Sequence, residues 1–352
     1  MRRSRFVTLL VSLLLIPFTS CSRPVPSRSE FVLGTVCSVN LYDRGNQKVY
    51  REIFARLREI ENLMSANLDD SDPGRINKAA GIEAVEVHPD TIAVLKRAVR
   101  FAALTGGAFD PTVGPLVKLW GIGSDAERIP GEEEIAAVLP LINWQDMVID
   151  EAVNTVFLKR RGMRLDLGAI AKGYAADEAA RIIKAAGIKR ALIDLGGNIL
   201  VLGAGRNGGR GSWRVGIQNP LEGRGAYFGI AEVADKTLVT SGVYERFFES
   251  GGRKYHHILS TRDGYPVDNG LLSVTVIGDS SIDADALSTS LFALGYETGS
   301  ALAESLDNTE AVFVFTDLGI RGTSGAFESF TITDDGFRIL TIPAADLPAG
   351  EW

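Results

Sequence analysis

The sequence predicts an α+β fold in a single domain that spans residues 31–345. Two observations point to this class. Helix-like and strand-like segments alternate irregularly, and several predicted strands follow one another directly, which disfavours a strict βαβ repeat. The chain has 352 residues, enough for one large domain or two small ones, but no repeat, low-complexity block or linker interrupts it after residue 30.

Four segments predict helices. Residues 47–66 place apolar side chains on one face, as an amphipathic helix does. Residues 88–107 have Pro89-Asp90 as a start signal and two glycines as a stop signal. Residues 169–188 predict a third helix, and residues 280–296 predict a buried helix of small and apolar side chains.

Short runs rich in β-branched and apolar residues indicate the strands. They lie at residues 154–160, 163–168, 190–203, 212–219, 236–242, 271–278 and 311–317.

The N-terminus carries a targeting signal. A basic start, MRRSR, precedes an apolar stretch that is too short to span a bilayer, and then Pro17 and the residues FTSC. Small residues before a cysteine predict a lipoprotein signal peptide at residues 1–20, cleavage before Cys21 and lipidation of Cys21. Phe18 departs from the leucine usual at that position, and an ordinary secretory signal is the alternative.

Residues 21–30 then form a lipidated tether, and the protein is anchored to the cell membrane on its exported side, which is the periplasm in a diderm bacterium. Cys37, the other cysteine, has no partner for an internal disulfide if Cys21 is acylated.

The charge of the chain excludes a nucleic-acid partner. The formal net charge is −7 and falls to about −10 without the three arginines of the predicted signal peptide. Binding to nucleic acid needs clustered cations, and no basic stripe is present.

Some apparent motifs carry no function. Residues 203–208, GAGRNG, match GxGxxG but precede a strand-like segment, so we expect a glycine-rich hairpin loop rather than a dinucleotide site. His88 precedes a helix and is expected to cap it or to face solvent. The absence of CxxC, HExxH and GxSxG leaves a zinc site or a serine hydrolase unsupported.

Three oxygen-bearing residues interrupt the apolar helix at 280–296. Asp285, Ser288 and Thr289 are spaced i, i+3 and i+4 and therefore share one helical face. A carboxylate in such a helix needs a partner. That partner is a backbone amide, a basic side chain or a cation, and the helix alone does not decide among them.

Three further segments are too specific for packing alone. Asp110 precedes a proline that fixes an extended corner, although it could simply cap a turn. Lys172 lies in the first turns of the helix that follows Asp166, where anions are favoured, although it could be a solvated residue. His256 and His257 are adjacent on a strand, where one of two such side chains usually faces solvent.

Together and in this order, these segments resemble the ApbE family, the FAD:protein FMN transferases. The resemblance covers about residues 30–335 and includes the lipoprotein signal. It implies a T-fold-related domain with a mixed, largely antiparallel sheet and packed helices. The matching blocks are MSANLDDSDPGRIN (64–77), GGAFDPTVGPL (106–116), DLGAIAKGYAAD (166–177), TSG (240–242) with HHILSTRDGYPV (256–267), and ADALST (284–289).

The resemblance also implies a set of site residues. Mg²⁺ would be held by Asp285, Thr289 and the backbone carbonyl of Ala169, with Ser288 either as an additional ligand or as a residue that contacts the ligands from outside. His257, and not His256, matches the family's histidine and would be the base. The residues expected to bind FAD are Leu33, Asn67, Ala108, Phe109, Asp110, Asp166, Lys172 and Ile258.

The implied reaction is Mg²⁺-dependent transfer of FMN from FAD to a Thr or Ser hydroxyl of an exported acceptor protein with a flavinylation motif. AMP is the leaving group. One alternative is an FAD pyrophosphatase that uses water and yields FMN and AMP. Another is a non-catalytic FAD-binding lipoprotein, which the metal ligands disfavour because flavin binding alone needs no Mg²⁺.

The chain departs from the family at several positions. Asn67 replaces an aromatic residue, Leu33 replaces Met, and Ser260-Thr261 replaces Asp-Pro. Residues 322–327, GTSGAF, resemble the family's acceptor motif. Phe327 stands at the accepting position and Arg321 at the acidic one, so self-flavinylation there is not expected.

Overall fold

The computed structural model describes residues 26–43, 45–205 and 211–340, and the predicted signal peptide and Cys21 lie outside them. The main feature is a nine-stranded sheet in which only the last pair of strands, β15 and β17, is parallel. In order across the sheet the strands are β1 (Arg28–Val32), β2 (Thr35–Leu41), β6 (Ala191–Leu195), β7 (Asn198–Leu202), β10 (Thr237–Gly242), β13 (Leu271–Gly278), β14 (Glu310–Phe315), β15 (Gly319–Gly322) and β17 (Arg338–Ile339).

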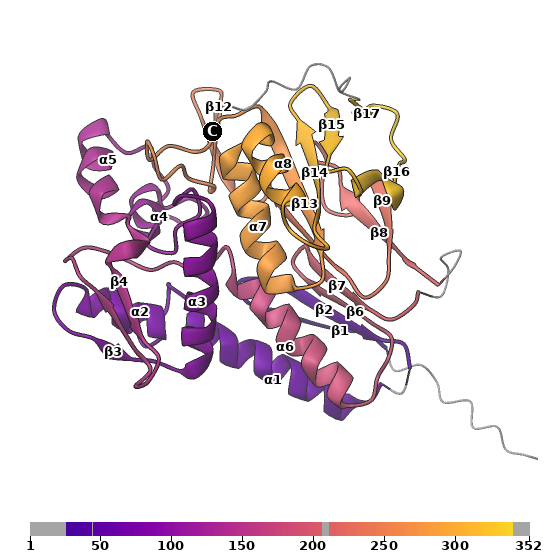
Figure 1. Cartoon of the computed structure of the whole chain (residues 1–352), viewed down its shortest axis with the longest axis horizontal. Helices are drawn as coiled ribbons and strands as arrows, with labels where there is room; N and C mark the ends of the chain where they lie inside the picture. Colours follow the sequence, from indigo (N-terminus) through magenta and orange to yellow (C-terminus); the bar gives the residue numbers. More distant parts are fainter. Residues whose placement is uncertain (1–25, 44, 206–210, 341–352) are drawn as a thin grey trace, which may run out of the picture.

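Helices cover one face of this sheet and bury the largest part of the core (Figure 1). The first of these helices presents an apolar stripe that includes Phe54 and Leu57, whereas the helix at Ser281–Leu294 is buried on nearly every side. The covering helices are α1 (Gln47–Met64), α6 (Ala171–Ala185), α7 (Ser281–Leu294) and α8 (Tyr296–Glu304). Helix α3 (Pro89–Leu104) packs against α7.

A second, three-stranded sheet covers the opposite face. It consists of β8 (Trp213–Gln218), β9 (Tyr227–Val233) and β16 (Phe330–Ile332). Val312 and Val314 of β14 face this layer, whereas their neighbours on the strand face the helices, as the two-residue period of a strand requires.

The remaining elements form a lobe beside α3 (Figure 1). A small apolar cluster centred on Trp120 holds part of it, and Trp120 Nε1 donates to the carbonyl oxygen of Gly264 at 2.7 Å. The elements are β3 (Val85–Glu86), β4 (Met147–Asp150), β5 (Thr155–Leu158), α2 (Asp72–Ala79), α4 (Gly114–Trp120), α5 (Glu132–Val138), β11 (Phe247–Ser250) and β12 (Arg253–His256), with short 3₁₀ turns at Leu139–Leu141 and Trp144–Asp146. A third 3₁₀ turn, Ala326–Glu328, lies outside this lobe and contacts β14 and β16.

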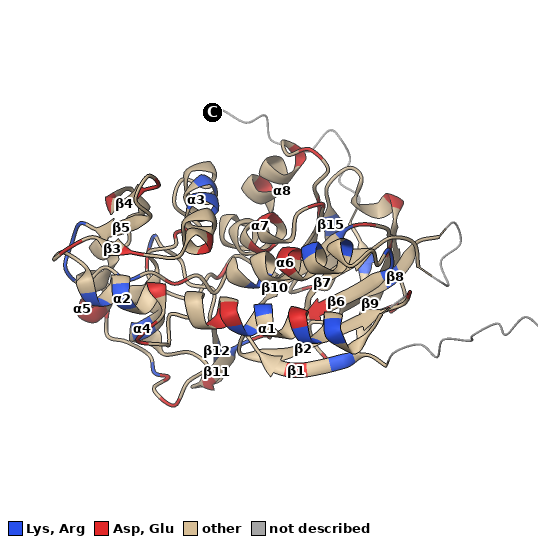
Figure 2. Cartoon of the chain, turned by 90° about the horizontal axis from the view of Figure 1, so that it is seen from below, with Lys and Arg blue, Asp and Glu red and all other residues tan. Residues whose placement is uncertain are grey.

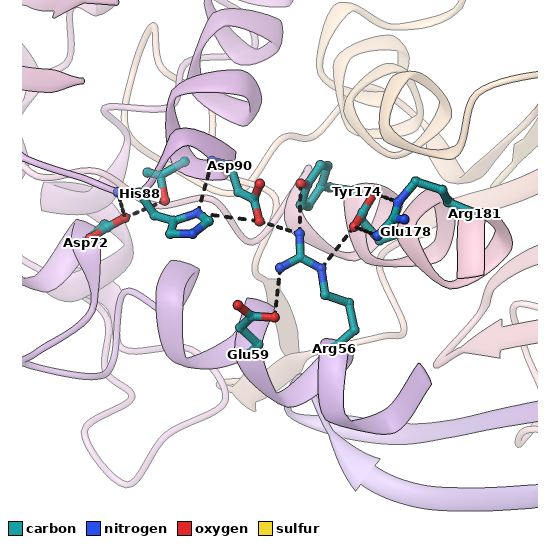
Figure 3. A network of polar contacts seen from close by, with 9 residues as sticks. Arg56, Glu59, Asp72, His88, Asp90, Tyr174, Glu178 and Arg181 are labelled. Carbon is teal, nitrogen blue, oxygen red and sulfur yellow. Dashed lines mark hydrogen bonds and ion pairs between the residues drawn. The ribbon is translucent and has the colours of Figure 1, made fainter. Parts of the chain in front are cut away.

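Arg56 connects three of the helices (Figure 3). Its guanidinium donates to Glu178 of α6 at 2.9 Å, to Glu59 of α1 at 2.9 Å, and to Asp90 of α3. It also donates to the hydroxyl of Tyr174 at 3.2 Å. The half-buried guanidinium thus stabilises the packing of α1, α3 and α6, because charge-assisted hydrogen bonds shielded from water are stronger than exposed pairs.

The α+β class and the largely antiparallel sheet are confirmed. The four predicted helices are confirmed as well, and His88 caps α3 by accepting from Asp90 N. On the side seen in Figure 2, basic and acidic residues are interspersed along α1, in keeping with the absence of a basic stripe in the sequence. Among the described residues, no helix is both long and apolar enough to cross a membrane.

Two predictions are wrong. Residues 163–168 form no strand, and Arg164 makes only an isolated bridge to Val113. The backbone of Leu165 is instead paired with the side-chain amide of Asn77, so no neighbouring strand is needed. The glycine-rich segment at 203–208, described only to residue 205, closes no hairpin between its flanking strands. It leads from β7 toward β8, which belongs to a different sheet.

Candidate functional site

Asp285 lies buried on α7, with only 3% of its surface exposed. Its Oδ2 accepts a hydrogen bond from the backbone N of Gly173 at 2.8 Å. Its Oδ1 lies 3.4 Å from Nζ of Lys172. Of the partners that a buried carboxylate could have, a backbone amide and a basic side chain are therefore both present, and α6 supplies both.

The close approach of α6 and α7 depends on Gly173. A Cβ added there would lie 2.2 Å from the carbonyl oxygen of Ser281 and 2.7 Å from the Cβ of Asp285. No side chain longer than hydrogen fits at that contact unless the helices move apart. The sequence motif contains this glycine, but only the contact across the helices explains it.

Asp177 of α6 caps the N-terminus of α7. Its carboxylate accepts from the backbone N of Ser281 at 3.0 Å and of Ile282 at 2.9 Å. No side chain of α7's own N-cap residue, Ser280, makes such a bond. Burial raises the pKa of Asp177, and the two amides partly oppose that rise. The two helices therefore exchange bonds, because α6 donates to Asp285 and α7 donates to Asp177.

Three hydroxyl groups adjoin Asp285. Ser241 of β10 lies between Ser288 and Thr289 of α7, at 2.9 Å and 3.0 Å from their hydroxyl oxygens. Ser288 is buried, and Thr289 is partly exposed. Of the face predicted from the spacing i, i+3, i+4, Ser288 and Thr289 are therefore turned toward strand β10, whereas the carboxylate of Asp285 is turned toward α6.

The loop before α6 is linked to the segment at 106–116. The backbone N of Asp166 donates to the carbonyl oxygen of Pro111 at 2.9 Å, and Asp166 Oδ1 accepts from Gly168 N at 2.7 Å. Ala169, the next residue, is partly buried just before α6 begins. Asp166, Ala169 and Lys172 are thus brought to the same end of α6.

The carboxylate of Asp110 is satisfied within its own neighbourhood. Oδ1 accepts from the backbone N of Thr112 at 2.7 Å and from its hydroxyl at 2.6 Å, and Oδ2 accepts from Trp144 N at 2.9 Å. Burial raises the pKa of Asp110 while these donors lower it. Asp110 orders the turn that presents Ala108 and the buried Phe109.

The two adjacent histidines differ in their surroundings. His256 is buried, its Nε2 lies 2.9 Å from the carbonyl oxygen of Val267, and its Nδ1 accepts from Ile258 N at 3.3 Å. Both ring nitrogens are thereby used in the fold. His257 keeps part of its surface exposed to solvent. The protein packed around its ring and the positive charge of Arg246 nevertheless lower its pKa to about 3. The imidazole of His257 is therefore neutral at pH 7.

The tautomer of His257 follows from the one ring hydrogen bond found within the described part of the chain. Nδ1 lies 3.2 Å from the carbonyl oxygen of Arg246, which can only accept a hydrogen bond. The proton of the neutral ring is therefore on Nδ1, and Nε2 carries the lone pair. A neutral imidazole with a free Nε2 can accept a proton.

The other predicted residues differ in burial. Ile258 is buried, and Leu33 occupies the tip of the β1–β2 hairpin with a left-handed φ of 57°. Asn67 is exposed in the turn between α1 and α2. Of the two residues that depart from the family's Asp-Pro pair, Ser260 Oγ accepts from Asp263 N at 3.4 Å, and Thr261 donates to the carbonyl oxygen of Gly107 at 2.8 Å.

The surroundings of Asp285 fit a magnesium ion. Among the described residues, no three His, Cys, Asp or Glu side chains gather into a metal site, which speaks against a zinc-type centre. Mg²⁺ is bound by few protein oxygens and retains water or phosphate ligands. Among the residues that the structure describes, Oδ1 of Asp285 has only the long contact to Nζ of Lys172, so it is the oxygen that could bind a cation.

The segment that resembles an acceptor motif is part of the folded core. Ala326 is buried, and the ring of Phe327 lies 6.1 Å from that of Phe330. Arg321 stacks over Tyr296 at 4.9 Å. Phe327, at the accepting position, and Arg321, at the acidic position, are therefore both packed against other side chains of the fold.

Comparison with known proteins places these residues in a family. The model of the ApbE family matches residues 33–313. Proteins named FAD:protein FMN transferase are 38% identical in Treponema pallidum, with 88% of this chain and 90% of that one covered, and 36% identical in Klebsiella pneumoniae, with 91% and 98% covered.

Solved structures give the same match. The crystal structure of the ApbE protein from Thermotoga maritima has a TM-score of 0.78 at 30% identity and covers 85% of this chain and 97% of that one. The flavin transferase ApbE from Vibrio cholerae has a TM-score of 0.77 at 32% identity, with 86% and 98% covered.

Proposed function

This chain belongs to the ApbE family, and from that premise we propose that it is an FAD:protein FMN transferase. It would move FMN from FAD to the hydroxyl of a Thr or Ser in an acceptor protein. The observation that carries the proposal is the junction of α6 and α7, where Asp285 lies beside Lys172 and one helical turn before Thr289. A single buried carboxylate beside a lysine and a hydroxyl is suited to a cation–phosphate pair.

We propose Mg²⁺ as the cation, held by Asp285, Thr289 and the backbone carbonyl of Ala169, with Ser288 as an additional ligand. When bound, the ion would neutralise charge on the pyrophosphate of FAD and on the departing AMP. Lys172 adds a positive charge in the first turn of α6, where the helix terminus itself favours anions.

A residue of this chain can accept the proton that the acceptor hydroxyl loses. In the proposed reaction the acceptor hydroxyl oxygen bonds to the phosphorus on the FMN side, and the bond from that phosphorus to the oxygen bridging to AMP breaks. AMP leaves with the electron pair. Nε2 of His257 would take the hydroxyl proton, because Nδ1–H donates to the carbonyl oxygen of Arg246 and the lone pair is therefore on Nε2.

A second activity is favoured by Asn67. The exposed Asn67 forgoes the stacking surface of an aromatic ring, a contact of about 1–3 kcal/mol by analogy with stacked bases. A less firmly held dinucleotide leaves room for water, so we also propose FAD hydrolysis to FMN and AMP in the absence of an acceptor.

The proposed setting is the exported side of the cell membrane, with Cys21 lipidated after removal of residues 1–20. The acceptor would then be another exported protein that carries a flavinylation motif. The MRRSR start, the short apolar stretch and the FTSC junction support this proposal.

One assay tests the function. The full-length protein is incubated with FAD, Mg²⁺ and a candidate acceptor, and AMP release and the mass of the acceptor are measured. The matched control is the same acceptor with Ala at the flavinylated Thr or Ser. AMP with a mass gain that the control acceptor lacks supports transfer, AMP and FMN without mass gain supports hydrolysis alone, and no AMP overturns both.

A further inference from the structure

We propose that Ser241 is a positioning residue that fixes the hydroxyl of Thr289 as a cation ligand. This inference rests on the proposed function, because it assigns a role within the Mg²⁺ site. Ser241 lies at the end of β10, and it acts on the site only through the two hydroxyl groups of α7 that it contacts.

The structure shows a chain of three hydroxyl groups that ends on a backbone carbonyl. Thr289 Oγ1 lies 3.0 Å from Ser241 Oγ, and Ser241 Oγ lies 2.9 Å from Ser288 Oγ. Ser288 Oγ lies 3.0 Å from the carbonyl oxygen of Asp285. Three contacts are thus shared among three hydroxyl protons.

The direction of the chain follows from its last member. A carbonyl oxygen only accepts, so Ser288 must donate to Asp285. A hydroxyl has one proton, and Ser288 therefore accepts from Ser241. Since the proton of Ser241 is then used, Thr289 must donate to Ser241. This is the one assignment in which all three contacts are hydrogen bonds.

This direction leaves the lone pairs of Thr289 Oγ1 available. A metal ligand must offer a lone pair, and a hydroxyl whose proton is already donated elsewhere does so without competition from its own O–H. Ser241 thus acts as the outer partner that holds a ligand in its binding orientation.

Without Ser241, Thr289 has another partner within its own helix. Threonine in a helix divides between two rotamers, because its hydroxyl can donate to the carbonyl four residues earlier. For Thr289 that residue is Asp285, whose carbonyl oxygen would then accept from Thr289 as well as from Ser288. Ser241 on strand β10 therefore favours the rotamer of Thr289 that donates to it over the rotamer that donates within the helix.

The position of Ser241 is well fixed for this role. It pairs in register with Val274 of β13, and β10 is an interior strand of the nine-stranded sheet. The acceptor that orients Thr289 is accordingly held by the sheet, whereas the ligand itself is on the helix.

The test uses Mn²⁺ as the probe, with free Mn²⁺ followed by electron paramagnetic resonance in titrations of the full-length protein, with and without FAD. Ser241→Ala is expected to weaken Mn²⁺ binding by about tenfold, as loss of an outer-sphere partner typically does. Ser241→Thr keeps the hydroxyl and is expected to restore most of the affinity. In a Thr289→Val background, Ser241→Ala should add no further loss.

The matched control is Ser290→Ala. Ser290 lies on the same helix, is buried, and donates to the carbonyl of Ala286 at 2.7 Å, so it has the same chemistry outside the chain of hydroxyls. Its Mn²⁺ affinity should equal that of the wild type. If Ser241→Ala fails to fold, Ser241→Cys serves instead, since it keeps the shape of the side chain but replaces the hydroxyl by a weak acceptor, and it should also weaken binding.

Two results overturn the proposal. Ser241 does not act through Thr289 if Ser241→Ala binds Mn²⁺ like the wild type. The same holds if Ser241→Ala weakens Mn²⁺ binding by the same factor in the Thr289→Val background as in the wild type. In both cases the transferase assignment stands. If the wild type binds no Mn²⁺ and turns over FAD in excess chelator, the metal part of the proposed function fails together with this inference.

Discussion

Replacement of Gly173 by alanine should disrupt both the stability of the fold and the site. An alanine in an open helix interior is favoured over glycine by about 1 kcal/mol. At this position, however, the new Cβ would lie 2.2 Å from the carbonyl oxygen of Ser281 and 2.7 Å from the Cα of Ile282. Both are backbone atoms, so no rotamer change relieves the contact.

The helices must therefore separate by about 1 Å to reach ordinary contact, and overpacking of this kind costs about 1–3 kcal/mol beyond the lost gain. We expect Gly173→Ala to lower the free energy of unfolding by about 1–3 kcal/mol, with a fall in Tm of roughly 2–5 °C for a domain of this size. The same separation lengthens the 2.8 Å bond from the amide of residue 173 to Asp285, so Mn²⁺ binding should weaken as well.

Calorimetry and the Mn²⁺ titration measure the two effects. Gly223→Ala is the matched control, because a Cβ there meets nothing within 4 Å and its φ is not left-handed, so its stability should be unchanged or slightly raised. If Gly173→Ala proves as stable as this control and binds metal normally, the contact between α6 and α7 is not as tight as the geometry requires.

Four further predictions concern the site and the anchor. Asp285→Asn keeps an acceptor for Gly173 N but loses the charge, so Mg²⁺-dependent FAD turnover should disappear while the Tm stays near that of the wild type; undiminished turnover would exclude Asp285 as a ligand. The pKa of His257 lies below its ordinary 6.5, near 3, so the unfolded chain binds this proton first and stability is lost as pH falls from about 6.5 toward 3. Because the side chain is partly exposed, we expect His257→Gln to remove only about 1 kcal/mol of that loss at pH 5, seen as a flatter profile of Tm against pH. Asn67→Tyr should tighten FAD binding in chelator and slow its hydrolysis in Mg²⁺, and equal constants for both proteins would mean that Asn67 does not touch the nucleotide. Cys21→Ser should release the protein from membranes, and a variant that stays bound after a high-salt wash contradicts the lipid anchor.

The helices and most strands were predictable because local signals agree with the packing. The apolar period of residues 47–66 and the Pro89 and double-glycine signals around α3 are written into short windows of sequence. The segment at 163–168 shows the limit of such signals. It has the composition of a strand, but the side chain of Asn77, far away in sequence, forms hydrogen bonds with the backbone N and O of Leu165.

The candidate site was predictable in part for the same reason. Spacing placed Asp285, Ser288 and Thr289 on one face, but it could not say which of three partners Asp285 would have. Gly173, Asp177 and Ser241 were not assigned a role, because each acts across an interface between elements that are far apart in sequence. A glycine and an acid four residues apart in a helix are the only local hint.

The cap that Asp177 provides has a consequence for how the site forms. Helix α7 has no side-chain cap of its own, and its first amides are bonded only when α6 is already in place. The opening of α7 and its separation from α6 should therefore be a single cooperative event rather than fraying from one end. In hydrogen exchange the amides of Ser281 and Ile282, at a helix terminus that would ordinarily exchange fast, should be protected as well as those inside the helix, and the residues around Asp285 would assemble and disassemble together.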